Sequence, residues 1–224
     1  MDTGLELLPR VLTFRPLVAP PVGGLCRILR ALANDGEQVL DVAELAGQRL
    51  VPGLTLKGDD SPSQSAFETR LLDTLRHFDP KRPVWVRSGP APLRELDLPP
   101  ALRDALARAD ETRFEVPLPE RARAWLERLQ SMGTSITSVL DAFCASAVPP
   151  SSTLIVQWNS MLKAGRTTDA LASIIAAHID PHSGADACAA RAQVLSAISL
   201  KPDAVVTAIA QLRRSWPPTP VANS

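Results

Sequence analysis

The sequence predicts an α/β fold with a mostly parallel sheet and crossover helices, followed by an all-helical subdomain. Up to residue 132, short runs typical of strands alternate with stretches of helical periodicity. Beyond Gly133 the helical pattern continues and the strand pattern stops. With 224 residues, 45% of them hydrophobic, the chain can bury a core. We therefore expect an α/β domain over residues 1–132 and a helical subdomain with a Pro-rich tail over residues 133–224.

The first strand is predicted over residues 11–18. Pro16 lacks an amide N–H, so we expect part of this strand to lie at an edge of the sheet or to form an irregular end. Leucine and isoleucine then recur at helical spacing from Leu25 to Leu32, and Asn34-Asp35-Gly36 is a turn that ends this helix. Residues 38–42 form the second expected strand.

The next helix has a clear start signal. Ser61 is expected to be its N-cap, with Pro62 in the first turn, and Asp79-Pro80 ends it. The remaining segments of the first half alternate in the order 83–87 (strand), 99–109 (helix), 113–118 (strand) and 119–132 (helix). The later helices are expected over residues 134–147, 151–163, 167–179, 186–198 and 202–216, with the tail from Pro217.

Composition excludes several classes of protein. Lys and Arg together number 24, as do Asp and Glu, so the chain lacks the basic field of a strong non-specific nucleic-acid binder. Tyr is absent and aromatic residues make up 4%, which leaves few side chains for base stacking. Cys26, Cys144 and Cys188 are widely spaced, so we expect no disulfide and a reducing compartment. Without a signal peptide or an apolar run of membrane length, the protein is expected to be cytoplasmic and not membrane-bound.

The turn between the first strand and helix lies where many nucleotide-binding α/β proteins carry a phosphate loop. Such a loop reads G-x-x-x-x-G-K-[ST], because backbone N–H groups and a lysine surround the phosphate oxygens. Here the matching residues are APPVGGLC, and Pro20 and Pro21 remove two backbone donors. The sequence therefore predicts only a remnant of the loop, made of Ala19, Gly23, Gly24, Leu25 (in the lysine position) and Cys26 (in the hydroxyl position).

The order of several segments resembles the C-terminal P-loop domain of tRNA 2-selenouridine synthase. The resemblance covers nearly the whole chain, and no single motif carries it. The matching segments are GEQVLDVAELAGQR (36–49), PSQSAFETRLLDTL (62–75), RPVWV (82–86), LPPALRDAL (98–106), EVPLPERARAWL (115–126), QWNSMLKAGR (157–166) and AAHIDPHSGAD (176–186).

The resemblance implies a P-loop NTPase-like scaffold and a cytoplasmic tRNA-modifying enzyme that acts on wobble 2-thiouridine and uses selenophosphate and a geranyl diphosphate. The family's rhodanese domain carries the transfer cysteine, and we expect that domain to be missing here, because the segment before Val11 is too short for it. This sequence differs from the family at the positions where the resemblance would place the site residues. Of the family's Asn-His-Arg-Gly-Ser run only Arg49 remains, and Arg87 and Gly89 stand in two acidic positions.

Candidate contacts to phosphate or RNA come from charge and position. Between Arg70 and Arg94 the basic residues outnumber the acidic ones by four, which is the highest local excess of positive charge in the sequence. Solvated helix and loop charges would give the same pattern. Ser63 and Gln64 lie near a predicted helix start, where they either contact an anion or act in capping. The full set of candidates is Arg49, Ser63, Gln64, Arg70, Arg76, Lys81, Arg82, Arg87 and Arg121.

His178, Asp180 and His182 could suggest metal ligands, but two His and one Asp within five residues at a helix end make a poor tetrahedral site, and the resemblance matches this segment to one that ends a helix. We therefore expect no catalytic residue, no metal and no cofactor, and whether the chain is an enzyme stays open, with a non-enzyme favoured. Three hypotheses follow. In the first, the chain is a catalytically degenerate relative of the synthase domain that binds RNA or a partner protein. In the second, it is the tRNA- and prenyl-diphosphate-binding subunit of a split synthase whose rhodanese part is a separate protein, and in the third it is a decayed scaffold with no ligand.

Overall fold

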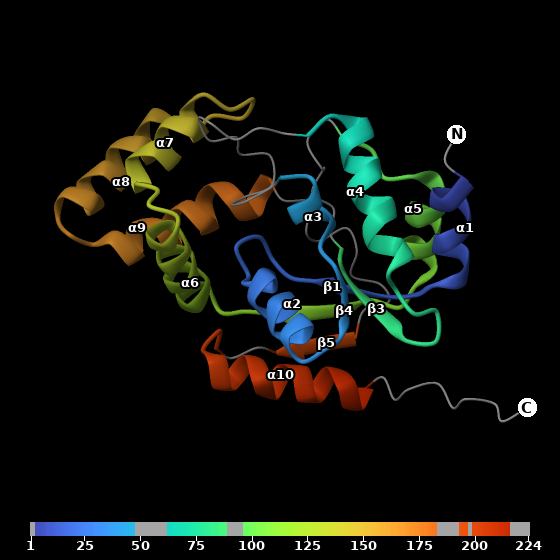
Figure 1. The fold of residues 1–224 in the computed structure, drawn as a ribbon. Coiled ribbons are helices and arrows are strands. Elements are labelled where there is room, and N and C mark those ends of the chain that lie inside the picture. The colour runs from blue at the N-terminus through green and yellow to red at the C-terminus, as the bar shows by residue number, and fades with distance from the viewer. Residues whose placement is uncertain (1–2, 48–61, 89–95, 183–192, 197–198, 216–224) are drawn as a thin grey trace, which may run out of the picture.

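A computed structural model describes residues 3–47, 62–88, 96–182, 193–196 and 199–215 (Figure 1). Its helices and strands alternate along the first half of the chain. The elements are α1 Thr3–Val11, β1 Thr13–Val18, α2 Leu25–Asn34, β2 Gln38–Leu40, α3 Val42–Leu45, α4 Gln64–Arg76, β3 Pro83–Arg87, α5 Pro100–Arg108, β4 Thr112–Glu115, α6 Leu118–Ser131, α7 Ile136–Cys144, α8 Ser152–Lys163, α9 Thr167–Ile174, a π-helical turn Ile175–Ile179, a 3₁₀ turn Asp180–His182, β5 Gln193–Ser196 and α10 Pro202–Ser215.

The described strands form one five-stranded sheet in the order β2-β3-β1-β4-β5, and every pairing is parallel. In the register, Phe14 lies opposite Val84 and Val18 lies opposite Arg113. Parallel strands require crossover connections, and α2, α4, α5 and the segment from α6 onward supply them. The predicted α/β fold with a parallel sheet is confirmed.

Helices cover both faces of the sheet because successive side chains of a strand point to opposite sides. Leu17 and Phe114 pack on α2 and α10 on one face. Phe14, Val84 and Val86 pack on α1, α4 and α5 on the other. Each fully buried side chain of this size stabilises the fold by roughly 1.5–3 kcal/mol. Together the two layers hold the strand ends in place for the loops that follow them.

The helices from α6 to α9 build a separate apolar cluster at one side of the sheet (Figure 1). Trp125, Phe143 and Trp158 are its largest aromatic members, and all three are buried. The Trp158 indole N–H donates to Ser173 Oγ at 3.0 Å, which satisfies the buried donor. In the described part of the chain, no helix is long and apolar enough to span a bilayer.

The expectation of an all-helical C-terminal part is wrong. Residues 193–196, predicted as part of a helix over 186–198, form β5, which pairs in parallel with β4 from Thr112 to Glu115. The helix α10 then packs on α2 of the sheet layer rather than on the helical cluster. A short apolar run such as QVLS suits either element, and here the free edge of β4 decides in favour of a strand.

The expected edge position of Pro16 is also wrong, because β1 is the central strand. Leu17 O accepts from Ser88 N at 2.9 Å, so the backbone N–H and C=O groups of Leu17 point toward β3. The backbone groups of the adjacent Pro16 therefore point toward β4. The pairing of β1 with β4 begins only at Leu17. The missing N–H of Pro16 therefore costs no ladder hydrogen bond.

Two helix starts differ from expectation. The helix α1 precedes β1 and includes Val11, so the strand that was predicted from Val11 begins at Thr13 instead. The cap of α4 is Ser63, whose hydroxyl accepts from Ala66 N at 3.2 Å, and not Ser61, which lies outside the described residues. Pro62 therefore precedes the cap instead of lying in the first turn.

Candidate functional site

The loop between β1 and α2 is a tight turn that bonds to its own chain. Gly23 N donates to Pro20 O at 2.8 Å, so this amide is not directed at a ligand. A Cβ atom on Gly23 would lie 2.5 Å from Pro20 O, which explains the glycine. Val22 has a φ of 57°, a conformation that an L side chain rarely adopts. The turn thus lacks the open cradle of backbone donors that phosphate binding requires.

The amino end of α2 is covered by an apolar side chain. Gly24 precedes the helix with a φ of 71°, and a Cβ atom there would lie 2.5 Å from Leu200 Cδ1. Leu25, in the lysine position of the motif, is buried in the core under the sheet. Cys26, the residue after Leu25 in the loop remnant, is partly exposed. The structure gives this remnant a packing role.

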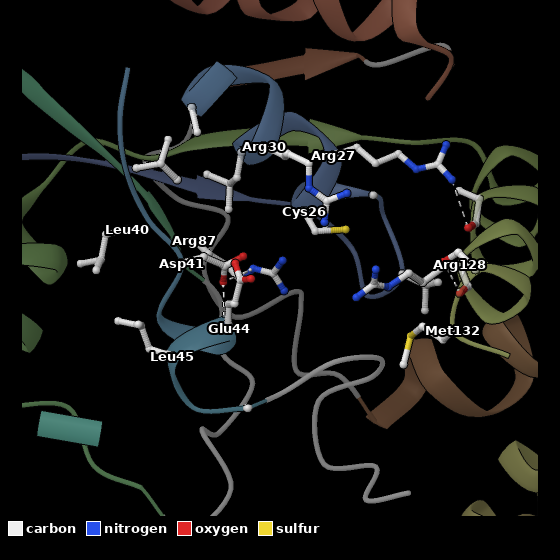
Figure 2. Close-up of a pocket in the computed structure, with 18 of the residues that line it drawn as sticks. Cys26, Arg27, Arg30, Leu40, Asp41, Glu44, Leu45, Arg87, Arg128 and Met132 are labelled. Carbon is white, nitrogen blue, oxygen red and sulfur yellow. Dashed lines mark hydrogen bonds and ion pairs between the residues drawn. The ribbon is translucent and has the colours of Figure 1, made fainter. Parts of the chain in front are cut away.

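A cavity of about 1120 Å³ lies beside the loop, at the carboxyl ends of β2 and β3 (Figure 2). Its walls come from α2, α3, α4 and α6. The chain leaves β1 toward α2 on one face of the sheet and leaves the adjacent β3 toward α5 on the other. Such a point of divergence is where open α/β sheets bind ligands. The cavity is therefore the candidate functional site.

Five arginines line the cavity, and two of them are neutralised by carboxylates. Arg27 Nη2 lies 2.6 Å from Glu127 Oε2. Arg87 Nε lies 3.0 Å from Asp41 Oδ1. The three other arginines are Arg30 on α2, Arg70 on α4 and Arg128 on α6.

Arg30, Arg70 and Arg128 share one property: within the described ranges, none of their guanidinium groups has a hydrogen bond or an ion pair. Figure 2 shows the Arg30, Arg87 and Arg128 side chains reaching into the space around Cys26. Glu44 is the single lining carboxylate without an arginine partner in the described part of the chain. The cavity therefore carries an excess of positive charge that can be offered to an anion.

The structure divides the basic segment that the sequence predicted as one patch. Arg70 and Arg87 line the cavity. Arg76, Lys81 and Arg82 lie at the other end of β3, which is about 13 Å long at roughly 3.3 Å per residue. Arg82 also donates to Gly36 O at 2.6 Å. The predicted contacts thus form two groups and not one surface.

Three further predicted contacts have structural partners. Ser63 caps α4. The Gln64 side chain donates to Glu68 Oε1 of the same helix at 2.7 Å and exchanges hydrogen bonds with the backbone of Asp97 at 3.0 and 2.9 Å. Arg121 is buried and pairs with Asp180. Arg49, Gly89 and Arg94 lie outside the described residues.

Sequence reasoning missed Arg27, Arg30 and Arg128. The first two are three residues apart on α2, which places them on one side of the helix. Arg27 and Arg30 were not recognised because they lie far in sequence from the basic segment 70–94. Arg128 was not recognised because it lies on α6, a helix far along the chain. Only the packing of α6 beside α2 brings these arginines together.

His178 is buried at the π-helical turn, and among the described residues no group of three or more His, Cys, Asp or Glu side chains is placed to hold a metal ion. Its ring contacts Phe143 edge-on at 4.9 Å and lies 5.1 Å from the His182 ring. Asp180, the third residue of the sequence cluster, bonds Arg121. Burial, with a further contribution from the charge of His182, lowers the pKa of His178.

This lowered pKa predicts acid sensitivity of the helical cluster. The folded state holds His178 neutral, so its contribution is complete above the ordinary pKa of about 6.5 and is lost as the pH falls below that value. The wild-type protein should lose unfolding free energy between about pH 7.5 and 5.5, and we expect this loss to be smaller in His178→Leu, which has no imidazole to protonate. Urea denaturation at the two pH values measures this. The matched control is His77→Leu, at an exposed histidine, and an equal effect of both variants would contradict the prediction.

Comparison with models of known protein families gives no match to this chain, and none of the curated proteins is significantly similar to it in sequence. The resemblance to the P-loop domain of tRNA 2-selenouridine synthase therefore stays a prediction.

Proposed function

We propose that this chain is a catalytically degenerate relative of the tRNA 2-selenouridine synthase P-loop domain that binds RNA through phosphate contacts in the arginine-lined cavity. The observation that carries the proposal is the convergence of Arg30, Arg70 and Arg128, from three different helices, on one cavity at the carboxyl end of the sheet. Guanidinium groups match phosphate oxygens in geometry and stay charged at all physiological pH values.

The strand order 2-3-1-4-5 supports a P-loop-type scaffold, because the turn before α2 then follows the central strand. The degenerate site is supported by the loop itself. Gly23 N bonds to the chain, and Leu25 is buried where a lysine would reach the phosphates. Arg87 pairs with Asp41 instead of leaving that carboxylate for a metal ion. The alternative of a split synthase stays a prediction, to be tested by adding a rhodanese partner in a tRNA-modification assay.

Charge reversal in the cavity tests the proposal. We expect Arg30→Glu/Arg128→Glu to lower the affinity for a tRNA pool at least about tenfold at low salt, because two phosphate contacts become repulsive. The slope of log affinity against log salt concentration should also become shallower by roughly 0.7–0.9 per lost contact. Filter binding across a salt series measures both quantities.

The matched control is Arg76→Glu/Lys81→Glu, which reverses the same number of charges at exposed positions outside the cavity. We expect this control to lose about threefold or less, through long-range electrostatics alone. Equal losses in the two double variants would place RNA outside the cavity. No binding of the wild-type protein at low salt would remove RNA and leave a partner protein as the ligand.

A further inference from the structure

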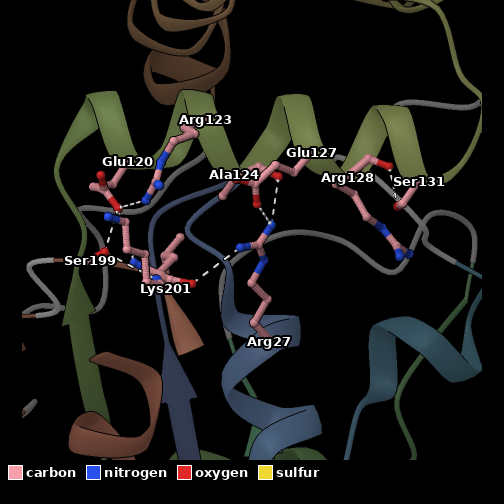
Figure 3. Close-up of polar contacts among 10 residues, drawn as sticks. Arg27, Glu120, Arg123, Ala124, Glu127, Arg128, Ser131, Ser199 and Lys201 are labelled. Carbon is pink, nitrogen blue, oxygen red and sulfur yellow. Dashed lines mark hydrogen bonds and ion pairs between the residues drawn. The ribbon is translucent and has the colours of Figure 1, made fainter. Parts of the chain in front are cut away.

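Ser199 and Leu200, which precede α10, are held by side chains of two other helices (Figure 3). Glu120 Oε2 on α6 accepts from Ser199 Oγ at 3.0 Å and from Leu200 N at 3.3 Å. Arg27 Nη1 on α2 donates to Leu200 O at 3.3 Å. Both backbone polar groups of Leu200 are thus bonded to side chains from elsewhere in the fold.

Leu200 also carries the apolar contact between this segment and α2. Its side chain is 2% exposed and belongs to the core cluster that contains Leu25, Val205 and Ile209. It lies directly against Gly24, so little space remains for it to move. The docking of the first turn of α10 on α2 therefore depends on the position of Leu200.

Arg27 connects this docking to the cavity. It lines the cavity together with Glu127, and its Nη2 also donates to Ala124 O at 3.4 Å. The side chains of Arg27 and Glu127 are 32% and 48% exposed, so an anion in the cavity can reach the pair. A phosphate is a strong acceptor for guanidinium and repels the carboxylate of Glu127. A guanidinium that turns toward the phosphate moves away from Leu200 O.

We propose that anion binding in the cavity and docking of the first turn of α10 compete for Arg27, so that the bound ligand loosens α10. The inference rests on the proposed function, since it concerns regulation of the same cavity. Linkage makes the effect reciprocal: a change that loosens the Leu200 segment strengthens ligand binding. Arg27 acts here as a positioning residue, because it transmits the competition between two parts of the fold.

Hydrogen exchange of the wild-type protein provides the first test, with a short single-stranded oligouridylate at low salt as the probe. The reporter is the first turn of α10, where Val205 N donates to Lys201 O at 3.0 Å. At saturation we expect exchange in this turn to accelerate about fivefold, the lower end of usual coupling energies. Exchange in α9, which lies in the helical cluster, should not change. Unchanged or slower exchange in α10 at saturation overturns the proposal.

Reciprocity provides the second test. We expect Leu200→Ala, which leaves all charges intact, to bind the oligouridylate several-fold more tightly than the wild type. Ser199→Ala removes the hydrogen bond that Ser199 Oγ donates to Glu120 and the one that it accepts from Lys201 N at 3.2 Å, and it serves as the milder variant if Leu200→Ala folds poorly. The control is Val206→Ala, at a side chain of α10 that is 65% exposed. Affinities equal to that of the control overturn the coupling. If the wild type binds no oligouridylate, the proposed function fails and this inference fails with it, whereas binding without a change in α10 rejects the coupling alone.

Discussion

Replacing Arg121 with methionine is expected to lower the free energy of unfolding by about 3 kcal/mol, the lower end of the range for breaking a buried ion pair. Arg121 Nη1 donates to Asp180 Oδ2 at 2.9 Å, and Nη2 and Nε donate to Pro21 O at 2.6 and 3.1 Å. The arginine side chain is 6% exposed and the aspartate 37%, so water compensates part of the loss at Asp180. Methionine retains the apolar stem but leaves Pro21 O without these donors.

Urea denaturation at neutral pH measures this change, and Arg166→Met is its control. Arg166 forms an ion pair with Asp169 three residues away, with side chains 60% and 57% exposed, so its loss should cost less than about 0.5 kcal/mol. A result in which Arg121→Met keeps full stability and instead loses RNA affinity would return Arg121 to the set of ligand contacts that the sequence predicted.

Gly24→Ala is the second substitution with a large expected effect. We expect it to destabilise the fold by about 3 kcal/mol, from roughly 1 kcal/mol of backbone strain and roughly 2 kcal/mol of overpacking. The backbone term arises because Gly24 has a φ of 71°. The packing term arises because the added methyl group would lie 2.5 Å from Leu200 Cδ1, in a side chain that the core surrounds.

Gly36→Ala separates these two terms. Gly36 has a φ of 79° and no atom within 4 Å of the position of an added Cβ, so it should lose only about 1 kcal/mol, the backbone term. In a Leu200→Ala background, the cost of Gly24→Ala should approach that of Gly36→Ala, because the clashing atoms are gone. A Gly24→Ala variant no less stable than Gly36→Ala in the wild-type background would contradict the close packing of Leu200 on the loop.

The fold class was predictable because its signals are local. Alternating strand-type runs and helical stretches indicate a parallel α/β arrangement, and β3 and α5 lie close to their predicted ranges. The lack of the G-x-x-x-x-G-K-[ST] motif in the turn before α2 was also predictable, since Leu25 stands at the position of the motif's lysine and stays apolar however the chain folds. By contrast, β5 was missed because an isolated run of four residues becomes a strand only when a partner such as β4 offers its free edge.

The α/β sheet, and the lack of a phosphate-loop lysine before α2, follow from the order and identity of the residues. Which charges lie together depends on how the helices pack. Arg121 lies on a helix rich in charge, yet Asp180 and Pro21, far away along the chain, bury its guanidinium group. Arg30 and Arg128 are separated by nearly a hundred residues, and only the packing of α2 and α6 around the sheet brings them to one cavity. Local patterns specify helices and strands because the backbone responds to neighbouring residues, whereas a binding site depends on contacts between residues that the sequence keeps apart.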